Sequence, residues 1–232
     1  MRFVRFSVDG TEHLGVEVDN EIRGLAVNDA AYPGSLDALI GDDSALKAAG
    51  EKLAAASAVR TDDVTYLPPF VKSSKIICVG LNYHDHSAES GYAQPEFPTV
   101  FARFQSGLIG HEAPIVRPQI SETLDFEGEL VAVIGKPAFK VSKEDALDYV
   151  AGYSIFNDGS IREFQHATPQ WTIGKNFDNT GAFGPVFVTE DELPKGCLGL
   201  KLETLLNGNV VQSAVIDDMV FSVVDLVSLL SQ

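Results

Sequence analysis

Two glutamates separated by one residue enter an apolar segment near the middle of the chain, in the sequence LDFEGELVAVIGK at 124–136. If this segment is a strand, Glu127 and Glu129 point to the same face. Like charges repel there, and partial burial of a carboxylate is costly unless a positive charge meets it. A divalent cation would offset both effects. An exposed strand end, with both carboxylates in water, fits the same spacing, so both interpretations stand at this point.

A third carboxylate, Asp158, ends the apolar run of YSIFNDGSIREFQ at 153–165. Ligation by two glutamates and one aspartate suits Mg²⁺, Mn²⁺ or Ca²⁺ and not a structural zinc site. The sequence Asn-Asp-Gly is also a common hairpin signal. Taken alone, Asp158 is therefore more typical of a turn residue than of a metal ligand.

A histidine-containing segment, GLNYHDHSAESG at 80–91, follows the strand-like KIICV. Loops that leave a strand often carry catalytic groups. If the segment is helical, His86 and Glu89 share a face, and the carboxylate can orient the imidazole as a general base for water. His84 and His86 could instead form a zinc-type pair. A solvated polar loop is the plain alternative to both.

A lysine lies in a loop rich in glycine and aromatic residues, TPQWTIGKNFDNTGAFGP at 168–185. Lys175 could contact an anionic substrate from this loop. A solvated loop lysine fits the sequence equally well.

The elements that must position these residues form two regions. Residues 1–30 hold short alternating runs typical of strands, and 35–60 are spaced for short helices. Pro68 and Pro69 mark a stiff connection, so we place a domain boundary there, giving 1–69 and 70–232. The second region repeats apolar, β-prone runs between Gly, Pro and Asn turns, with helical patterns near 142–150 and 221–230. We predict an α+β, β-rich fold.

Composition limits the partners. The 232 residues include 17 basic and 33 acidic side chains, a formal charge of −16. Such a charge disfavours nucleic acid and anionic membranes, because its field repels phosphate. No apolar stretch approaches the roughly 18–20 residues that span a bilayer, and we expect no signal peptide. Cys78 and Cys197 are too few for a disulfide framework. We therefore expect a cytoplasmic protein.

The order VGLNYHDH…E, LDFEGELVAVIGK, FNDGSIREFQ and QWTIGKNFD resembles the fumarylacetoacetate hydrolase family over about residues 70–230. The resemblance implies a mixed β-roll or barrel catalytic domain, a small N-terminal α/β domain, a homodimer and a Mg²⁺ or Mn²⁺ site. By motif position it implies that the metal ligands are Glu127, Glu129 and Asp158 and that the water-activating dyad is His86 with Glu89. It also implies that Lys175 contacts the substrate and that Arg162 and Gln165 form an R-x-x-Q pair near it.

Two departures from the family pattern matter. Members commonly carry a small residue where this chain has His84, so we expect His84 to add or alter substrate contacts. Members also usually continue past DMVFSVVDLVSLLS with a further strand, a Pro-Gly-Asp turn and a Gly-Thr-Pro loop. The domain at 70–232 is therefore expected to be incomplete at its C-terminal end, with an open barrel and impaired activity if that part is absent.

The resemblance implies a metal-dependent hydrolase that cleaves a C–C bond in a 2,4-dioxo acid. Acylpyruvate, fumarylpyruvate and 2,4-diketo-3-deoxy sugar acids are of this type, and the product is pyruvate or a related 2-oxo acid. The dyad favours this reaction over oxaloacetate decarboxylation or 2-oxo acid hydration or isomerisation, because decarboxylation needs no activated water. A catalytically impaired cation-binding scaffold is the alternative from another class.

Overall fold

The N-terminal region is an antiparallel meander covered by two helices. The computed structural model describes residues 1–84 and 96–232. The strands are β1 (Arg2–Val8), β2 (Thr11–Val18) and β3 (Glu21–Ala26), with short β4 (Ala58–Val59) and β5 (Thr65–Tyr66); the helices are α1 (Leu36–Leu39) and α2 (Asp43–Ala54). The side chain of Asp42 accepts hydrogen bonds from two backbone N–H groups at the start of α2, a standard N-cap. Phe3 and Leu14 belong to the same buried core cluster as Leu46 and Leu53 of α2.

The large sheet continues from this meander into the rest of the chain. Its further strands are β8 (Leu108–Ile109), β10 (Gly128–Ile134), β11 (Val150–Asp158), β13 (Gly181–Phe183) and β14 (Val186–Thr189). The ten strands follow the order β4-β3-β2-β1-β14-β11-β13-β8, with β10 paired to β11 and β5 to β1. Because β1 pairs with β14, one sheet crosses the boundary at residue 69. The division into 1–69 and 70–232 stays a prediction.

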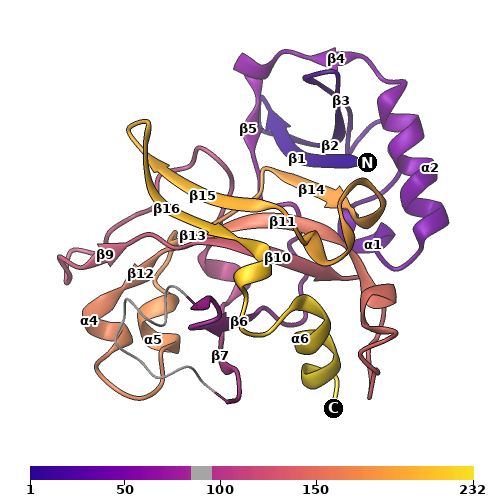
Figure 1. Ribbon diagram of the computed structural model, residues 1–232. Helices are drawn as coiled ribbons and strands as arrows, with labels where there is room; N and C mark the ends of the chain where they lie inside the picture. Colours follow the sequence, from indigo (N-terminus) through magenta and orange to yellow (C-terminus); the bar gives the residue numbers. More distant parts are fainter. Residues whose placement is uncertain (85–95) are drawn as a thin grey trace.

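Smaller strand pairs and helices surround the large sheet (Figure 1). The pairs are β6 (Ile77–Gly80) with β7 (Thr99–Ala102), β9 (Leu124–Asp125) with β12 (Ser160–Ile161), and β15 (Lys201–Leu206) with β16 (Asn209–Val215). The helices are α4 (Arg162–Gln165), α5 (Thr172–Lys175) and α6 (Val223–Leu230). The predicted α+β, β-rich class is confirmed.

The expected helix at 142–150 is wrong. Ser142 accepts a hydrogen bond from the backbone N–H of Asp145, but only a 3₁₀ turn at Ala146–Tyr149 follows. Val150 already belongs to β11, whose pairing with β10 outweighs the local helical pattern. The C-terminal helix, α6, begins with a capping box between Ser222 and Asp225. None of the helices in the described residues has the length and hydropathy to cross a bilayer.

Candidate active site

Strand register brings two of the predicted carboxylates together. The backbone N–H of Asp158 donates to the carbonyl of Glu127 at 2.8 Å, and the N–H of Glu127 donates to the side chain of Asn157 at 3.1 Å. Glu129 lies opposite Phe156 in the same β10–β11 pair. Asp158 is the last residue of β11, and its side chain is buried. The hairpin-turn interpretation of Asp158 is therefore wrong, and so is a fully solvated strand end.

Lys175 joins these carboxylates. Its ammonium donates to Oε2 of Glu127 at 2.6 Å and to Oδ2 of Asp158 at 2.9 Å. The residue is 1% exposed, and its Nζ lies 4.8 Å from the ring centroid of Phe101. The interpretation of Lys175 as a solvated loop residue is therefore wrong.

A glycine allows the helix that carries Lys175 to approach its neighbour. A Cβ atom at Gly174 would lie 2.3 Å from the backbone nitrogen of Gln165, far inside van der Waals contact. Only a residue without a side chain lets α5 pack directly on α4. The QWTIGK segment and the R-x-x-Q segment therefore reach the same cavity.

Arg162 and Gln165 form the next layer of the site. The Arg162 guanidinium donates to Oδ2 of Asp125 through Nε at 2.8 Å and Nη2 at 2.6 Å. Its Nη1 donates to Oε1 of Glu127 and, at 2.8 Å, to Oε1 of Gln165, which is buried. Arg162 thus contacts Glu127 directly, and Gln165 is linked to Glu127 through Arg162.

Arg103 is a site residue that the sequence reasoning missed. It is 3% exposed, and its Nε lies 3.3 Å from Oδ1 of Asp158. Its Nη1 donates to the carbonyl of Gly159 and the hydroxyl of Thr180, both at 3.4 Å. The available signal was an arginine inside the apolar run VFARF, since a charged side chain in a buried strand requires a partner.

Gly181 and Phe156 lie next to the Arg103 guanidinium. A Cβ at Gly181 would lie 2.3 Å from Nη2 and 2.7 Å from the Phe156 ring, so a larger residue there would displace the guanidinium or the ring. The guanidinium carbon lies 5.3 Å from the ring centroid of Phe156, within cation–π range.

Gln212 is a second missed residue. Its Oε1 accepts from the N–H of Gly128, and its Nε2 donates to the carbonyl of Gly128, each at 2.8 Å. Thr204 on the paired strand donates to the same Oε1 at 2.8 Å. The β15–β16 hairpin therefore hydrogen-bonds both backbone groups of Gly128, the single residue between Glu127 and Glu129.

The three carboxyl groups differ in their electrostatic surroundings. Burial acts to raise the pKa of Glu127, but Lys175 and Arg162 outweigh it and hold that pKa below its usual value. Burial raises the pKa of Asp158, and Lys175 and Arg103 offset this only in part. Loss of hydration, followed by the charges of Glu127 and Asp158, raises the pKa of Glu129 to about 8. Glu129 makes no hydrogen bond or ion pair with any other described residue.

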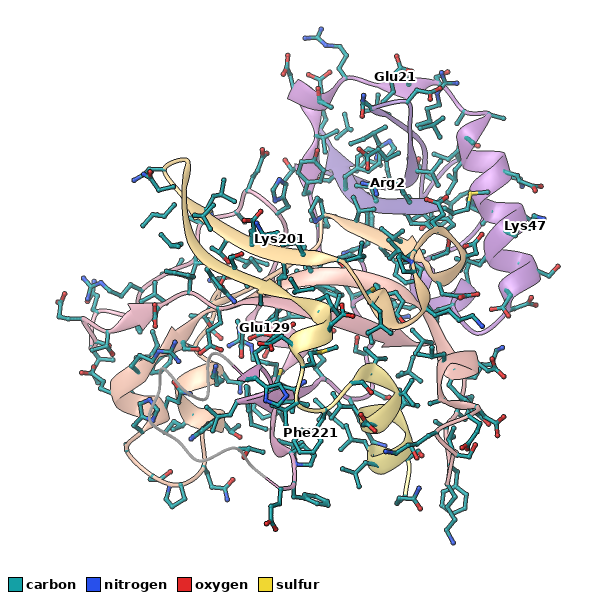
Figure 2. All side chains as sticks on the ribbon, viewed as in Figure 1. Arg2, Glu21, Lys47, Glu129, Lys201 and Phe221 are labelled. Atoms are coloured by element: carbon teal, nitrogen blue, oxygen red, sulfur yellow. The ribbon has the colours of Figure 1, made fainter. Side chains whose placement is uncertain are left out.

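The three carboxylate residues, together with Lys175 and Arg162, line one part of a cavity of about 1860 Å³. Figure 2 shows Glu129 near the middle of the molecule. Oδ1 of Asp158 is buried and, apart from its ion pair with Arg103, has no hydrogen-bond partner among the described residues; Glu129 has none either. The donors are hard carboxylate oxygens, which fit Mg²⁺ or Mn²⁺.

No three His, Cys, Asp or Glu side chains within residues 1–84 and 96–232 are arranged to hold a metal ion. Instead, the oxygens of Glu127 face Lys175 and Arg162. The chemistry of the donors fits a hard cation, and the ligand assignment stays a prediction.

The histidine segment lies only in part within the described residues. His84 is exposed and does not line the described part of the cavity, whereas its neighbour Tyr83 does. His86 and Glu89 lie outside the described residues. The dyad, the His84–His86 zinc pair and the substrate contact of His84 therefore stay predictions.

Fold and site together define a sheet-rich α+β protein with carboxylates and buried cations converging in one cavity. A sequence profile described as "Fumarylacetoacetate (FAA) hydrolase C-terminal" matches residues 75–232. The chain is 35% identical over 239 residues to the mitochondrial oxaloacetate tautomerase Fahd2a of Rattus norvegicus, covering 100% of this chain and 76% of that protein.

Solved structures agree. Fumarylacetoacetate hydrolase from the psychrophilic Exiguobacterium antarcticum has a TM-score of 0.84 and 34% identity, covering 100% of this chain and 81% of that one. Maleylpyruvate hydrolase from Sphingobium sp. SYK-6, in complex with manganese(II) and pyruvate, has a TM-score of 0.81 and 26% identity, covering 100% and 83%. The chain belongs to the fumarylacetoacetate hydrolase family. It spans 56% to 65% of the length of several other curated relatives.

Proposed function

We propose that this protein is an enzyme that binds a small 2-oxo acid together with a divalent cation, Mg²⁺ or Mn²⁺, at Glu127, Glu129 and Asp158. The observation that carries the proposal is Lys175, buried between Glu127 and Asp158 in a cavity that also contains Glu129. Such a group of carboxylates is unfavourable unless cations balance it. The manganese and pyruvate in the maleylpyruvate hydrolase complex support the same pairing of ligands.

The protein groups have distinct roles in this proposal. A cation held by these carboxylates would act as a Lewis acid for negative charge that develops on the bound acid. Lys175 donates a hydrogen bond to a substrate oxygen, and Arg162 and Gln165 orient the substrate carboxylate. Phe101 and Trp171, whose ring centroids are 5.9 Å apart, give the Lys175 side of the cavity an apolar wall that excludes water.

The first reaction we propose is keto–enol interconversion of oxaloacetate. It requires charge stabilisation at the C2 oxygen and proton transfer at C3, without an attacking water, so the described residues supply its electrostatic part. The rat relative named as an oxaloacetate tautomerase, matched over this whole chain, supports it. The test follows the ultraviolet absorbance of oxaloacetate enol with Mg²⁺, with Mn²⁺ and with EDTA. A rate equal to the uncatalysed one in all three conditions contradicts the proposal.

Hydrolytic cleavage of a 2,4-dioxo acid is the second candidate, favoured by the His86 and Glu89 pattern. In this reaction His86, oriented by Glu89, would deprotonate the water that attacks the distal carbonyl. The C–C bond would then break to give a carboxylic acid and the enolate of a 2-oxo acid, which takes the proton back at C3. A panel of acylpyruvates with a coupled pyruvate assay tests it, and pyruvate formed from oxaloacetate in the same assay reports decarboxylation. His86→Ala should slow hydrolysis about 10²- to 10⁴-fold and leave Mn²⁺ binding unchanged. Binding of Mn²⁺ and oxalate without turnover of any of these acids would instead identify a non-catalytic scaffold.

We also propose the homodimer that the family resemblance implies. Light scattering at several protein concentrations tests this, and a mass of one chain throughout contradicts it.

A further inference from the structure

Lys175 occupies the place where positive charge is needed when no metal is bound. Its ammonium is within hydrogen-bond distance of one oxygen of Glu127 and one oxygen of Asp158, and it is shielded from water. We propose that Lys175 is the internal counter-ion of the cation-free site and that a divalent cation binds in competition with it. This inference rests on the proposed function, because it takes Glu127 and Asp158 as the metal ligands.

The other two cations of the site are anchored elsewhere. Arg162 donates twice to Asp125, and Arg103 is held by the carbonyl of Gly159 and the hydroxyl of Thr180. Lys175, by contrast, donates only to Glu127 and Asp158 among the described residues, besides its contact with the ring of Phe101. Its ammonium is a compact charge on a flexible stem. Lys175 is therefore the cation of the three that can leave these carboxylates without breaking other hydrogen bonds.

The exchange has two consequences. In the cation-free protein the ammonium separates two buried carboxylates that would otherwise repel each other, so it stabilises the fold. When a divalent cation arrives, the ammonium is a like charge close to it and weakens its binding. Once displaced, Lys175 becomes available to an anionic substrate, which couples binding of the acid to prior binding of the metal.

The test compares Lys175→Met with the wild type, using Mn²⁺ alone as the probe. Methionine keeps most of the length of the side chain and removes its charge. Lys47→Met is the matched control, because Lys47 is exposed on α2 and lies far from Glu129 in Figure 2. The Kd for Mn²⁺ is measured by calorimetry, and the Tm is measured in EDTA and in saturating Mn²⁺.

We expect Lys175→Met to lower the Tm in EDTA and to tighten the Kd for Mn²⁺ by about tenfold or more. The gain in Tm on adding Mn²⁺ should be larger than in the wild type, whereas Lys47→Met should match the wild type in all three values. A purely structural lysine would lower both Tm values equally. A variant that folds only in Mn²⁺ supports the proposal too.

The experiment distinguishes failure of the proposed function from failure of this inference. If the wild type binds no Mn²⁺, the proposed function fails, and this inference fails with it. If the wild type binds Mn²⁺ but Lys175→Met binds it equally or more weakly, the competition is refuted and the proposed function stands. Lys175→Gln, which keeps a hydrogen-bond donor, is the second variant. If neither variant folds even in saturating Mn²⁺, the metal cannot replace the ammonium, and the inference is overturned.

Discussion

The N-terminal meander and the carboxylate site use charge in opposite ways. In the meander, Phe3, Phe6 and Leu14 form an apolar interior, and ion pairs such as Arg2–Glu17, at 2.8 Å, lie at the surface with side chains 45% and 29% exposed. In the site, the Arg103–Asp158 pair is almost fully buried, with side chains 1% and 3% exposed. Surface pairs contribute little to stability, whereas buried pairs carry a large desolvation cost. Under the proposed function, this desolvation cost is offset when the buried charges bind a cation and an acid.

Removing one cationic side chain from each region should show the largest difference between them, in the free energy of unfolding. Arg103→Met leaves Asp158 with a buried oxygen facing no cation, so we expect a loss of about 3–5 kcal/mol in the free energy of unfolding. Arg2→Met, at the surface pair, should cost about 0–1 kcal/mol. Urea unfolding in EDTA measures both values. Equal losses in the two variants would contradict the comparison.

Replacing Glu127 should weaken metal binding, whereas replacing a glutamate of the N-terminal meander should not. Glu127→Gln keeps the shape of the side chain but removes the charge that both Lys175 and Arg162 meet, so the Kd for Mn²⁺ should weaken about 100-fold or more. Glu17→Gln, in the surface pair with Arg2, should leave the Kd unchanged. Calorimetry with Mn²⁺ measures both, and an unchanged Kd in Glu127→Gln would remove this residue from the ligand set.

The two regions should also respond to pH with opposite signs. The pKa of Glu12 is lowered by its hydrogen bond with Arg5, so its contribution is present above the unfolded value of 4.5 and is lost as the pH falls through the lowered pKa. The pKa of Glu129 is raised from 4.5 to about 8, chiefly by loss of hydration. Its contribution is therefore complete below 4.5 and is lost as the pH rises from about 4.5 to about 8.

The pH dependence of stability that comes from Glu129 is measured on the metal-free protein. The Tm in EDTA should fall between about pH 5 and pH 8 in the wild type, and Glu129→Gln should flatten the fall because glutamine has no proton to lose. Glu12→Gln should leave that fall in place and change the profile only below about pH 4.5. A wild-type Tm that rises steadily to pH 8, with no difference in Glu129→Gln, would show that the pKa of Glu129 is not raised.

The sequence predicted the charged residues in its recognised motifs better than the residues that hold them in place. Glu127, Asp158 and Lys175 meet in the cavity as their motif order implied, and Arg162 and Gln165 lie beside them. These residues are visible in sequence because each lies in a short local pattern. The Asn-Asp-Gly pattern was ambiguous, since a hairpin turn and a strand end have the same local chemistry. The pairing of Asp158 with Gly181 decides between them, and that pairing is set by another part of the chain.

Arg103 and Gln212 could not be assigned for the same reason. Arg103 lies in the segment before the carboxylates, and Gln212 lies in a hairpin long after them, so neither is near its partner in sequence. Their roles follow from strand register and from close approach at glycines, such as Gly181 beside Arg103. Hydrophobic patterning fixes which residues are buried, but it does not fix which buried polar groups face each other.

The smallest effect we predict tests whether Gln212, which contacts the backbone between the two glutamates, affects metal binding. Gln212→Met removes both hydrogen bonds to Gly128 while keeping the volume of the side chain, so Glu127 and Glu129 should lose part of their fixed spacing. The Kd for Mn²⁺ should weaken about tenfold, less than for Glu127→Gln, because the backbone pairing of β10 with β11 is retained. Gln232→Met, which removes a glutamine that donates to the carbonyl of Ser228 at the chain end, is the matched control and should leave the Kd unchanged. If Gln212→Met lowers the Tm but leaves the Kd for Mn²⁺ intact, the hairpin stabilises the sheet without positioning the carboxylates.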